Sequence, residues 1–467
     1  MQDKSPYQLL GFLALGVYFI YCGVYFIERV CYADSAHMLF KMIQSGSFNI
    51  EAGRYPQILT QIPVILALKW KISLKAVAFI YSISFPLFFG AAALVSYTVY
   101  KNRWAPALLV FALTGTVNYS FFHCATETHQ SIAWGLLFYS WILSPVAVFE
   151  RSPQYLIQLL WGALFAVLSM HAHPVGFFFI IFSLGYYIAQ RKDFKNPAVY
   201  FVFILIAVLS LYKTAQTEAT SYEGQFLSVI PEFPKLLGDF GNNWTREYFF
   251  NELNHTYLFL WTIFVLALAG MLRRRMFLRA SYYLLFNVGL LIFTMLIYHK
   301  GDSYVMMERA FMPLAFTVAA PAMELICVSK KTRNNLIQAL AIIIVFMVGF
   351  GRISEKAMFM DERLAYMNKL HQKYSAPKIC LKTSQVDMQL IEVPWPVCFE
   401  SLLYSSAVYG KDSCFTISVM SEEEFEAADL SSPDNFITPG FFGSLKTTEL
   451  NQQFFKIPPQ PYVAEVE

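Results

Sequence analysis

The sequence predicts an all-α polytopic membrane protein of about 11 transmembrane helices that ends in a small α/β domain. Hydrophobic residues make up 57% of the 467 residues and charged residues 14%, whereas soluble domains contain about 45–50% and about 25%. Apolar stretches of about 20 residues, the length that crosses a bilayer as a helix, recur along the first three-quarters of the chain. The net charge of +3 is too small to indicate a nucleic-acid partner.

A transmembrane domain is expected over residues 1–352. The first apolar segment lacks a small-residue cleavage site, so it is expected to remain as a signal anchor. Gln57–Leu68 is apolar over only about twelve residues and contains Pro63, which favours an interfacial or re-entrant helix. The expected spans are 7–28, 76–99, 104–123, 131–149, 155–172, 174–190, 198–213, 256–272, 280–298, 310–328 and 336–352.

Basic residues set the expected orientation, because Lys and Arg concentrate in cytoplasmic loops. The N-terminus is then inside, and residues 29–75 and 353–467 are outside. Lys69, Lys71 and Lys75 also fall outside in this arrangement; if 57–72 were a true span, Asp34 would move to the cytoplasm. The basic loops contain Lys101, Arg103, Arg151, Arg191, Lys192, Lys195, Arg273, Arg274, Arg275, Arg279, Lys330, Lys331 and Arg333.

Residues 353–467 are expected to form a soluble extracytoplasmic domain. Two apolar runs, Lys378–Lys382 and Cys414–Met420, are typical of short strands, and Phe399–Gly410 between them is typical of a helix. This pattern predicts a small α/β unit. Its three cysteines, Cys380, Cys398 and Cys414, could form a disulfide only in an oxidising compartment.

The segment after the first span contains a helical pattern that begins with an acid. Asp34 and His37 share one side with Lys41 and Gln44, while apolar residues take the other side. This pattern predicts an amphipathic helix on the outer membrane surface, within the surface segment 29–75. Asp34 at its start is also suited to cap the helix, and this alternative stays open.

Histidines and acids at span ends fall almost entirely on the expected outer side. Such one-sidedness predicts a polar cavity at that face, because ionisable groups at membrane depth are generally functional. Each residue alone has a simpler explanation, such as a helix cap at Glu127 or an interfacial anchor at Arg54 beside Tyr55. The group comprises His123, Glu127, His129, His171, His173, His255, His299, Lys300, Asp302, Glu308 and Arg309.

An acid just after the first helix, surface helices, many spans and an outer C-terminal domain together resemble the GT-C superfamily of integral-membrane glycosyltransferases. GRYPQILTQIP and SISFPLFFGAAALVSYTVYKNRW are similar to the stretch leading into helix 2 of protein mannosyltransferase-like and aminoarabinose-transferase-like enzymes. WGALFAVLSMHAHPVG is similar to their helix 5 segment, and ERAFMPLAFTVAAP to their R-Y-x-x-P element. The likeness covers about residues 1–350. The family often has a carboxylate pair in its first loop, whereas here the second acid must be Glu51 or Glu127.

This resemblance implies an inverting transfer of a hexosyl or pentosyl group from a polyprenyl-phosphate carrier to a glycan, lipid or protein acceptor. Asp34 would be the general base and Glu127 the second acid. The apolar surface helices of residues 36–68 would receive the prenyl tail, with membrane lipids as neighbours. The resemblance implies no particular cofactor, and a divalent metal stays an open alternative. The implied substrate- and phosphate-binding residues are His37, Arg54, Tyr55, His129, His173, Lys300 and Arg309.

The site is expected to face the periplasm or exterior of a bacterial inner (cell) membrane. A multi-span transporter or lipid flippase is the main alternative, but transport sites lie near the bilayer midplane, and these charges gather at one face. A non-catalytic membrane assembly protein would explain the C-terminal domain and leave the polar residues unexplained.

Overall fold

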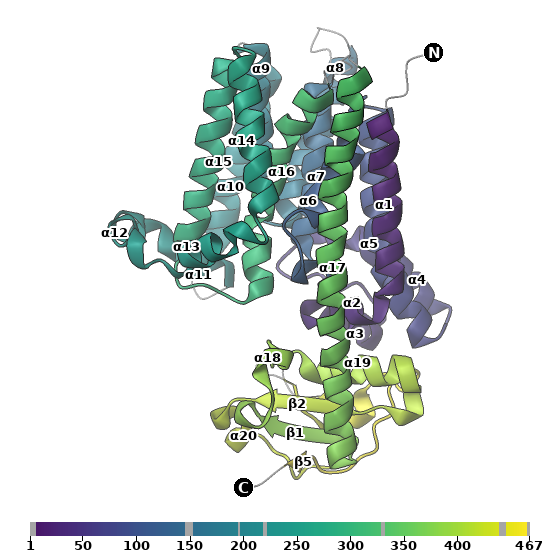
Figure 1. Cartoon of the computed structure of the whole chain (residues 1–467). Helices are drawn as coiled ribbons and strands as arrows, with labels where there is room; N and C mark the ends of the chain where they lie inside the picture. The colour runs from purple at the N-terminus through teal and green to yellow at the C-terminus, as the bar shows by residue number, and fades with distance from the viewer. Residues whose placement is uncertain are drawn as a thin grey trace.

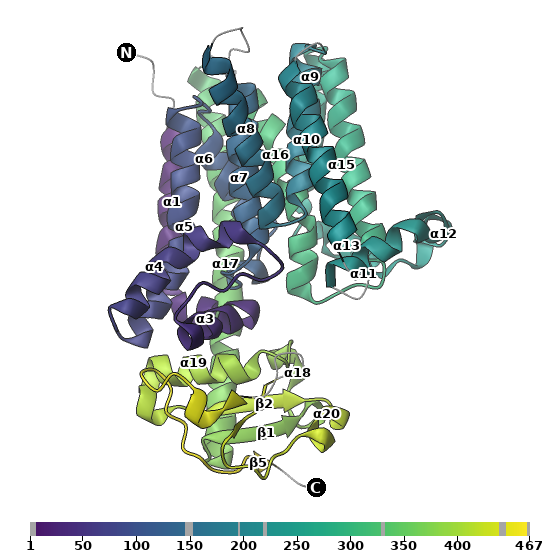
Figure 2. The same cartoon turned by 180° about the vertical axis from the view of Figure 1, so that it is seen from behind.

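The computed structural model describes residues 6–144, 153–194, 197–217, 222–327, 332–438 and 445–464. It is mostly helical, at 75%. A bundle of long helices forms one part, and a small α/β domain lies beyond one end of it (Figures 1 and 2). Arg151, Lys195, Lys330, Lys331 and residues 145–149 of one expected span lie outside the described residues.

A helix coincides with each of the eleven expected spans. The count of eleven crossings nevertheless stays a prediction. Within the described ranges, three helices are long and apolar enough to cross a membrane, namely α5, α10 and α15, or four if Trp244–Asn254 and Leu258–Arg273, which meet at 84°, form one broken span. The bundle helices are α1 (Pro6–Val24), α5 (Leu74–Thr98), α6 (Ala105–Thr114), α7 (Glu127–Leu143), α8 (Pro153–Ala172), α9 (Gly176–Arg191), α10 (Pro197–Gln216), α14 (Leu258–Arg273), α15 (Phe277–Ile297), α16 (Tyr304–Cys327) and α17 (Thr332–Tyr374).

Helix α6 corrects the expected span 104–123. It has only ten residues, all of them buried, and rises about 15 Å, half of the roughly 30 Å hydrocarbon thickness. The chain leaves the helix at Gly115, and the Glu308 carboxylate then accepts hydrogen bonds from the backbone N–H groups of Asn118, Tyr119 and Ser120. These donors bond to a side chain, so they do not extend the helix.

Short helices gather at the end of the bundle that faces the α/β domain. Three of them fall in the expected surface segment: α2 (Phe26–Val30), α3 (Ala33–Ser45) and α4 (Ile58–Lys69). Helix α4 has the expected length of about twelve residues, and Leu59, Ile62 and Leu66 form an exposed apolar row on it. No helix was expected between residues 213 and 256, but this segment contains α11 (Tyr222–Val229), α12 (Phe233–Gly238) and α13 (Trp244–Asn251).

The C-terminal domain contains the expected strands and helix. Strands β1 (Lys378–Lys382), β2 (Thr416–Met420) and β5 (Val463–Ala464) form a parallel sheet in the order β2-β1-β5. Helix α19 (Val397–Tyr409) packs against β2. Cys380, Cys398 and Cys414 are buried free thiols. The remaining elements are α18 (Met388–Ile391), α20 (Glu422–Ala427) and the antiparallel pair β3 (Asn435–Phe436) and β4 (Leu445–Lys446).

Helix α17 joins the two parts without a break. It has 43 residues, about 65 Å of helix, and runs from the bundle into the C-terminal domain (Figure 1). Ser354 on this helix is hydrogen-bonded to Tyr21 of α1, with 2.9 Å between the two hydroxyl oxygens. The expected domain boundary at residue 353 therefore falls inside a continuous helix, and no flexible linker separates the domains there.

Helix α3 lies between the bundle and the C-terminal domain (Figure 2). It is amphipathic as expected, but its apolar side does not face lipid. Leu39, Phe40 and Ile43 are fully buried, and the Phe40 ring lies 4.8 Å from that of Phe399 in α19. The C-terminal domain covers the α3 part of the surface that was expected to receive a prenyl tail, because an amphipathic pattern does not distinguish lipid from a protein partner. The apolar row on α4 stays exposed.

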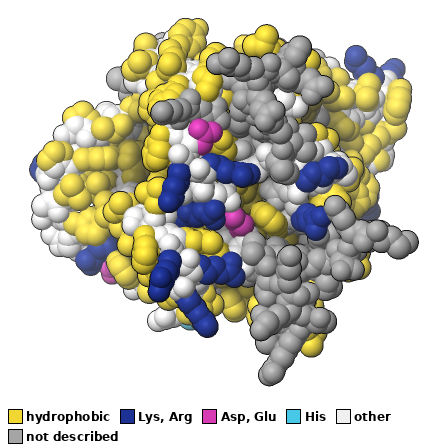
Figure 3. Space-filling model, turned by 90° about the horizontal axis from the view of Figure 1, so that it is seen from above, with side chains coloured by type: hydrophobic (Ala, Val, Ile, Leu, Met, Phe, Trp, Pro, Cys, Tyr) yellow, Lys and Arg dark blue, Asp and Glu magenta, His cyan; other side chains and the backbone are white. Residues whose placement is uncertain are grey.

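Lys and Arg side chains gather at the opposite end of the bundle (Figure 3). The α5–α6, α9–α10 and α14–α15 connections carry exposed basic residues there: Lys101, Arg103, Arg191, Lys192, Arg273, Arg274 and Arg275. This distribution is typical of a cytoplasmic end.

We predict that Gly46 and the C-terminus lie on the same, outer side of the membrane. The Gln44 side-chain amide donates to the Glu449 carbonyl, and the Asn451 amide donates to the Ile43 carbonyl at 2.8 Å, so α3 and the C-terminal domain must share a side. Alkaline phosphatase inserted at Gly46 or fused to the C-terminus should be active in both cases. One active and one inactive fusion would contradict the contact between α3 and the C-terminal domain. Two inactive fusions would show that both sites lie on the cytoplasmic side, opposite to the predicted orientation.

Candidate functional site

Asp34 lies in the first turn of α3 and faces residues from two distant segments. Its Oδ2 atom lies 3.0 Å from His123 Nε2, in the α6–α7 connection, and 3.6 Å from Arg309 Nη1, in α16. The Asp34 side chain is 43% exposed, whereas those of His123 and Arg309 are 1% and 8% exposed. Asp34 is thus accessible while its partners lie behind it.

Asp34 does not cap α3. Tyr32 is the N-cap residue of α3, and its side chain makes no capping hydrogen bond to the helix. The Asp34 carboxylate lies within the first turn, where a negative charge interacts favourably with the helix dipole. The capping explanation for Asp34 is therefore wrong.

Glu127 opens α7 and is the second carboxylate of the site. Its Oε1 accepts from Arg54 Nη1 at 2.8 Å and from the Gln57 amide at 2.7 Å, and its Oε2 accepts from Arg309 Nη2 at 3.1 Å. Arg309 therefore connects both carboxylates through one guanidinium group. We call Asp34, Arg54, His123, Glu127 and Arg309 the charged cluster.

Local backbone structure holds the members of this cluster in place. The turn before Arg54 has positive φ at Ala52 and Gly53 (49° and 66°) and closes with a hydrogen bond from the Arg54 N–H to the Glu51 carbonyl. The Thr126 hydroxyl lies 2.9 Å from His123 Nδ1, which leaves Nε2 for Asp34.

Two further contacts align the segments that carry these side chains. The Ser35 hydroxyl accepts from the Ala125 N–H at 3.2 Å, which attaches α3 to the α6–α7 connection. Glu308, next to Arg309, fixes the neighbouring residues 118–120 through three backbone N–H groups.

The carboxylates of the cluster are paired with cationic side chains. Asp34 and Glu127 face the guanidinium groups of Arg54 and Arg309, and a buried charge is tolerated only when it is paired in this way. Burial raises the pKa of Asp34, but the contacts with His123 and Arg309 outweigh burial, so the pKa of Asp34 lies well below its usual range. Asp34 is accordingly ionised at neutral pH.

His37 lies one helical turn after Asp34 and faces the C-terminal domain. Its ring lies 5.9 Å from that of Trp395 and 5.2 Å from that of Phe399, and its Nδ1 lies 3.5 Å from Glu51 Oε1. Burial, assisted by the charge of Lys41 and opposed by that of Asp34, lowers the pKa of His37 to about 4. His37 is therefore neutral near pH 7, so its contact with Glu51 is not an ion pair.

Four expected site residues do not contact the charged cluster in the part of the chain that the structure describes. Tyr55 is 63% exposed, although the neighbouring Arg54 contacts Glu127. His129 is buried beside Phe89, with ring centroids 6.3 Å apart. His173 accepts from the Val175 N–H in the α8–α9 turn, and Lys300 is exposed in the α15–α16 connection.

Three residues with roles at the site were not among the expected site residues. His123 contacts Asp34, Gln57 contacts Glu127, and Glu308 organises residues 118–120. The sequence signal for His123 and Glu308 was their position at span ends on the outer side. Gln57 carried no such signal, since an uncharged amide in an apolar stretch is not distinctive.

The cluster is better suited to an anion than to a metal ion. Within residues 6–144, 153–194, 197–217, 222–327, 332–438 and 445–464, no group of three or more His, Cys, Asp or Glu side chains is placed to hold a metal. Asp34 and Glu127 already share Arg309. The residues present therefore do not provide a site for a resident divalent cation.

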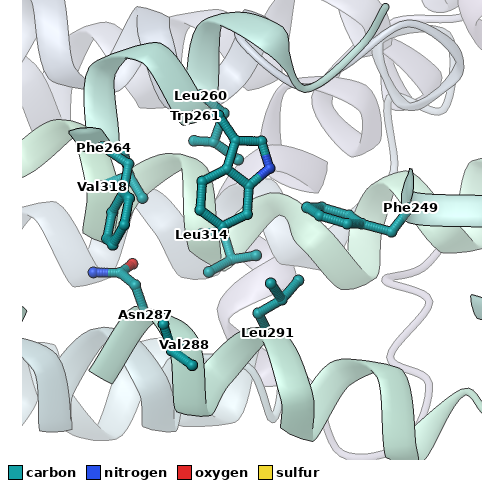
Figure 4. A pocket seen from close by; sticks show the side chains of 9 residues that line it. All are labelled: Phe249, Leu260, Trp261, Phe264, Asn287, Val288, Leu291, Leu314 and Val318. Carbon is teal, nitrogen blue, oxygen red and sulfur yellow. The ribbon is translucent and has the colours of Figure 1, made fainter. Parts of the chain in front are cut away.

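Two cavities lie away from the charged cluster. One opens between α14, α15 and α16, where apolar side chains surround Asn287 (Figure 4). The Asn287 amide is satisfied by the Tyr283 carbonyl and the Thr317 hydroxyl, so it offers no free group for chemistry. The other, of about 180 Å³, lies in the C-terminal domain and is lined by Pro394, Trp395, Cys398, Ser418, Val419, Met420, Glu424, Ile437 and Thr438.

Comparison of the chain with models of protein families, with curated proteins and with solved structures finds no match.

We predict that acid weakens the fold through His37. The pKa of His37 is about 4 in the folded protein, below the ordinary histidine value of 6.5, so the unfolded chain binds this proton more tightly. The contribution to the free energy of unfolding is constant above pH 6.5 and falls as the pH drops towards 4, by up to about 3 kcal/mol. Thermal unfolding of the purified protein at pH 7.5 and pH 4.5 measures this loss.

His37→Gln should reduce the difference between the two melting temperatures. His255→Gln is the matched control, because His255 is exposed and should leave the difference unchanged. Equal acid sensitivity in wild type and His37→Gln would contradict the role of His37.

Proposed function

We propose that the chain is a membrane glycosyltransferase that moves a sugar from a polyprenyl-phosphate carrier to an acceptor on the extracytoplasmic face. The observation that carries the proposal is the charged cluster itself. It combines an accessible carboxylate with a guanidinium group that bridges two acids, at the end of a helical bundle next to a polar domain. The end of the bundle that carries the charged cluster is extracytoplasmic if the opposite end, which carries the exposed Lys and Arg residues, is cytoplasmic.

Asp34 acts as the general base in this proposal. It accepts the proton of the acceptor hydroxyl as that oxygen attacks the anomeric carbon. The bond between the anomeric carbon and the phosphate oxygen breaks in the same displacement, so the configuration inverts. The polyprenyl phosphate leaves with the bonding electrons, and the proton remains on Asp34.

Arg309 and Arg54 stabilise the negative charge that develops on the departing phosphate. Both guanidinium groups are already held in place by Glu127, so they need little reorganisation. The Arg309 Nε atom is buried and has no hydrogen-bond partner among the described residues. The Arg309 guanidinium therefore keeps one donor that is not used by Asp34 or Glu127.

Arrival of the phosphate also changes the basicity of Asp34. In the free protein Arg309 contributes to the low pKa of Asp34, and a carboxylate with a low pKa is a weak base. A phosphate bound at the Arg309 guanidinium places a negative charge beside Asp34 and removes part of this effect. Donor binding thus makes Asp34 a stronger base at the moment when a base is required.

The prenyl tail lies along α4 in this proposal. Leu59, Ile62 and Leu66 are 46%, 39% and 44% exposed, and they form an apolar row that starts five residues after Arg54. A transporter or lipid flippase would use the same charged groups without transferring a sugar, and this alternative is separated by assaying the transfer product directly.

We predict that Asp34→Asn lowers the rate of sugar transfer by about 10²–10⁴-fold. Asparagine keeps the size of the side chain and an oxygen facing His123. It removes the basic carboxylate oxygen together with the charge that faces Arg309, which is why the rate is compared per folded protein. The measurement is transfer from a polyprenyl-phosphate sugar to acceptor in membranes, normalised to folded protein. Asp302→Asn is the matched control, because Asp302 is an exposed aspartate in an outer connection. Transfer by Asp34→Asn at the wild-type rate would end the case for Asp34.

A second prediction concerns the phosphate. Arg309→Lys keeps the charge but loses the planar fork that reaches Asp34 and Glu127 together. Loss of one charged hydrogen bond, about 1.5–3 kcal/mol, should lower kcat/KM for the lipid-linked donor by about 10–100-fold. Arg279→Lys is the control, since Arg279 pairs with Glu324 at 3.3 Å elsewhere in the bundle. Equal donor kinetics in both variants would move phosphate binding to other residues.

A further inference from the structure

The residue before Asp34 has an unusual backbone conformation. Ala33 has a φ of +47°, in the left-handed region that residues other than glycine rarely adopt. Such conformations persist only where surrounding structure enforces them. The Ala33 N–H donates to Glu400 Oε1 in α19 at 2.6 Å. A side chain of the C-terminal domain thus holds the start of the helix that carries Asp34.

Glu400 is itself held by a buried partner. It is fully buried, and its second carboxylate oxygen pairs with Arg363 of α17, which is 1% exposed. Arg363 also lies against the Tyr32 ring, with its guanidinium carbon 5.2 Å from the ring centroid. The Glu400–Arg363 pair therefore fixes the chain on both sides of the Tyr32–Ala33 bond.

A second carboxylate holds Tyr32. The Tyr32 hydroxyl donates to Glu392 Oε2 at 2.9 Å, and Glu392 has a φ of +57°. The other Glu392 oxygen lies 3.8 Å from Lys356 Nζ in α17. Both residues that precede Asp34 are thus fixed by acids that lie about 360 positions later in the sequence.

The residues that Asp34 faces belong to the bundle. His123 and Arg309 contact its carboxylate, and the Ser35–Ala125 hydrogen bond attaches the next residue to the same side. Asp34 therefore lies between the C-terminal domain and the bundle. The C-terminal domain fixes the backbone just before Asp34, and the bundle contacts its side chain. A displacement of about 1 Å in such an arrangement can cost about 10²-fold in rate.

We propose that Glu400, oriented by Arg363, is a positioning residue for Asp34 and that the C-terminal domain thereby completes the active site. This inference rests on the proposed function. Glu400 contacts the backbone of Ala33 and takes no part in proton transfer. Its role is to keep the Ala33 backbone in the left-handed region, which sets the direction of the Asp34 side chain.

Glu400→Gln tests this role, because it removes the charge that pairs with Arg363. We expect kcat to fall by about 10–100-fold while KM for the lipid-linked donor changes little, since the arginines are untouched. Phe40→Leu is the matched control: it weakens the packing of the same helix on Phe399, Phe436 and Phe455 without affecting Ala33. Phe40→Leu should lower the melting temperature and leave kcat near wild type.

Ala33→Gly supplies the specific rescue. Glycine adopts positive φ without a steric cost, so Ala33→Gly in the Glu400→Gln protein should restore part of kcat. A general loss of stability would not be restored in this way. If Glu400→Gln does not accumulate, Glu400→Asp, which keeps the charge but shortens the side chain, takes its place.

A readout without enzymatic activity separates this inference from the proposed function. The rate at which a membrane-impermeant maleimide modifies Asp34→Cys should change in the Glu400→Gln background, because position 34 moves. Suppose that Asp34→Asn transfers sugar at the wild-type rate and that Glu400→Gln still changes the maleimide rate of Asp34→Cys. The catalytic role of Asp34 would then be rejected, while the positioning role of Glu400 would be retained. Unchanged kcat in Glu400→Gln together with an unchanged maleimide rate would overturn the inference.

Discussion

The end of the bundle that faces the C-terminal domain depends on the contacts of the Arg309 guanidinium group. It contacts Asp34 at 3.6 Å and Glu127 at 3.1 Å, and Glu127 in turn holds Arg54. Removal of one partner of a buried ion pair costs far more than the pair gains, because the remaining charge is left without water. The positions of α3, the turn before α4, the start of α7 and the start of α16 are therefore set together.

The charged cluster could be predicted in part, because ionisable residues at span ends are rare and fall on one side. Asp34, Glu127 and Arg309 were found in this way, whereas Arg54 was predicted from the resemblance. His129, His173 and Lys300 satisfy the same criterion but do not join the cluster, and Tyr55, predicted from the resemblance, does not join it either. The position of a residue near a span end does not show whether its side chain is buried or exposed. Arg54 and Tyr55 are neighbours in the sequence, but Arg54 is partly buried whereas Tyr55 is exposed. Pairings such as Ala33 with Glu400 join residues 367 positions apart and carry no local signal.

The fold was predictable where hydrophobic periodicity decides it. Helices occupy all eleven apolar segments, and β1 coincides with Lys378–Lys382. Helix α6 is shorter than its apolar stretch because Glu308 binds the following N–H groups, an effect of a residue almost 190 positions away. Helix α3 was read as a lipid-facing surface because Leu39, Phe40 and Ile43 suit lipid and protein equally. Helices α11 to α13 were missed because each has at most eight residues, too few for a periodic pattern.

The unbroken course of α17 has a mechanical consequence. A helix resists bending and twisting along its axis, so a rotation imposed on its C-terminal turns reaches Lys356, Arg363 and the bundle without a joint to absorb it. An antibody fragment or small molecule that binds the exposed C-terminal domain would therefore exert torque on the segments beside Asp34. A ligand bound to the C-terminal domain could therefore act on the helical bundle without entering the bilayer.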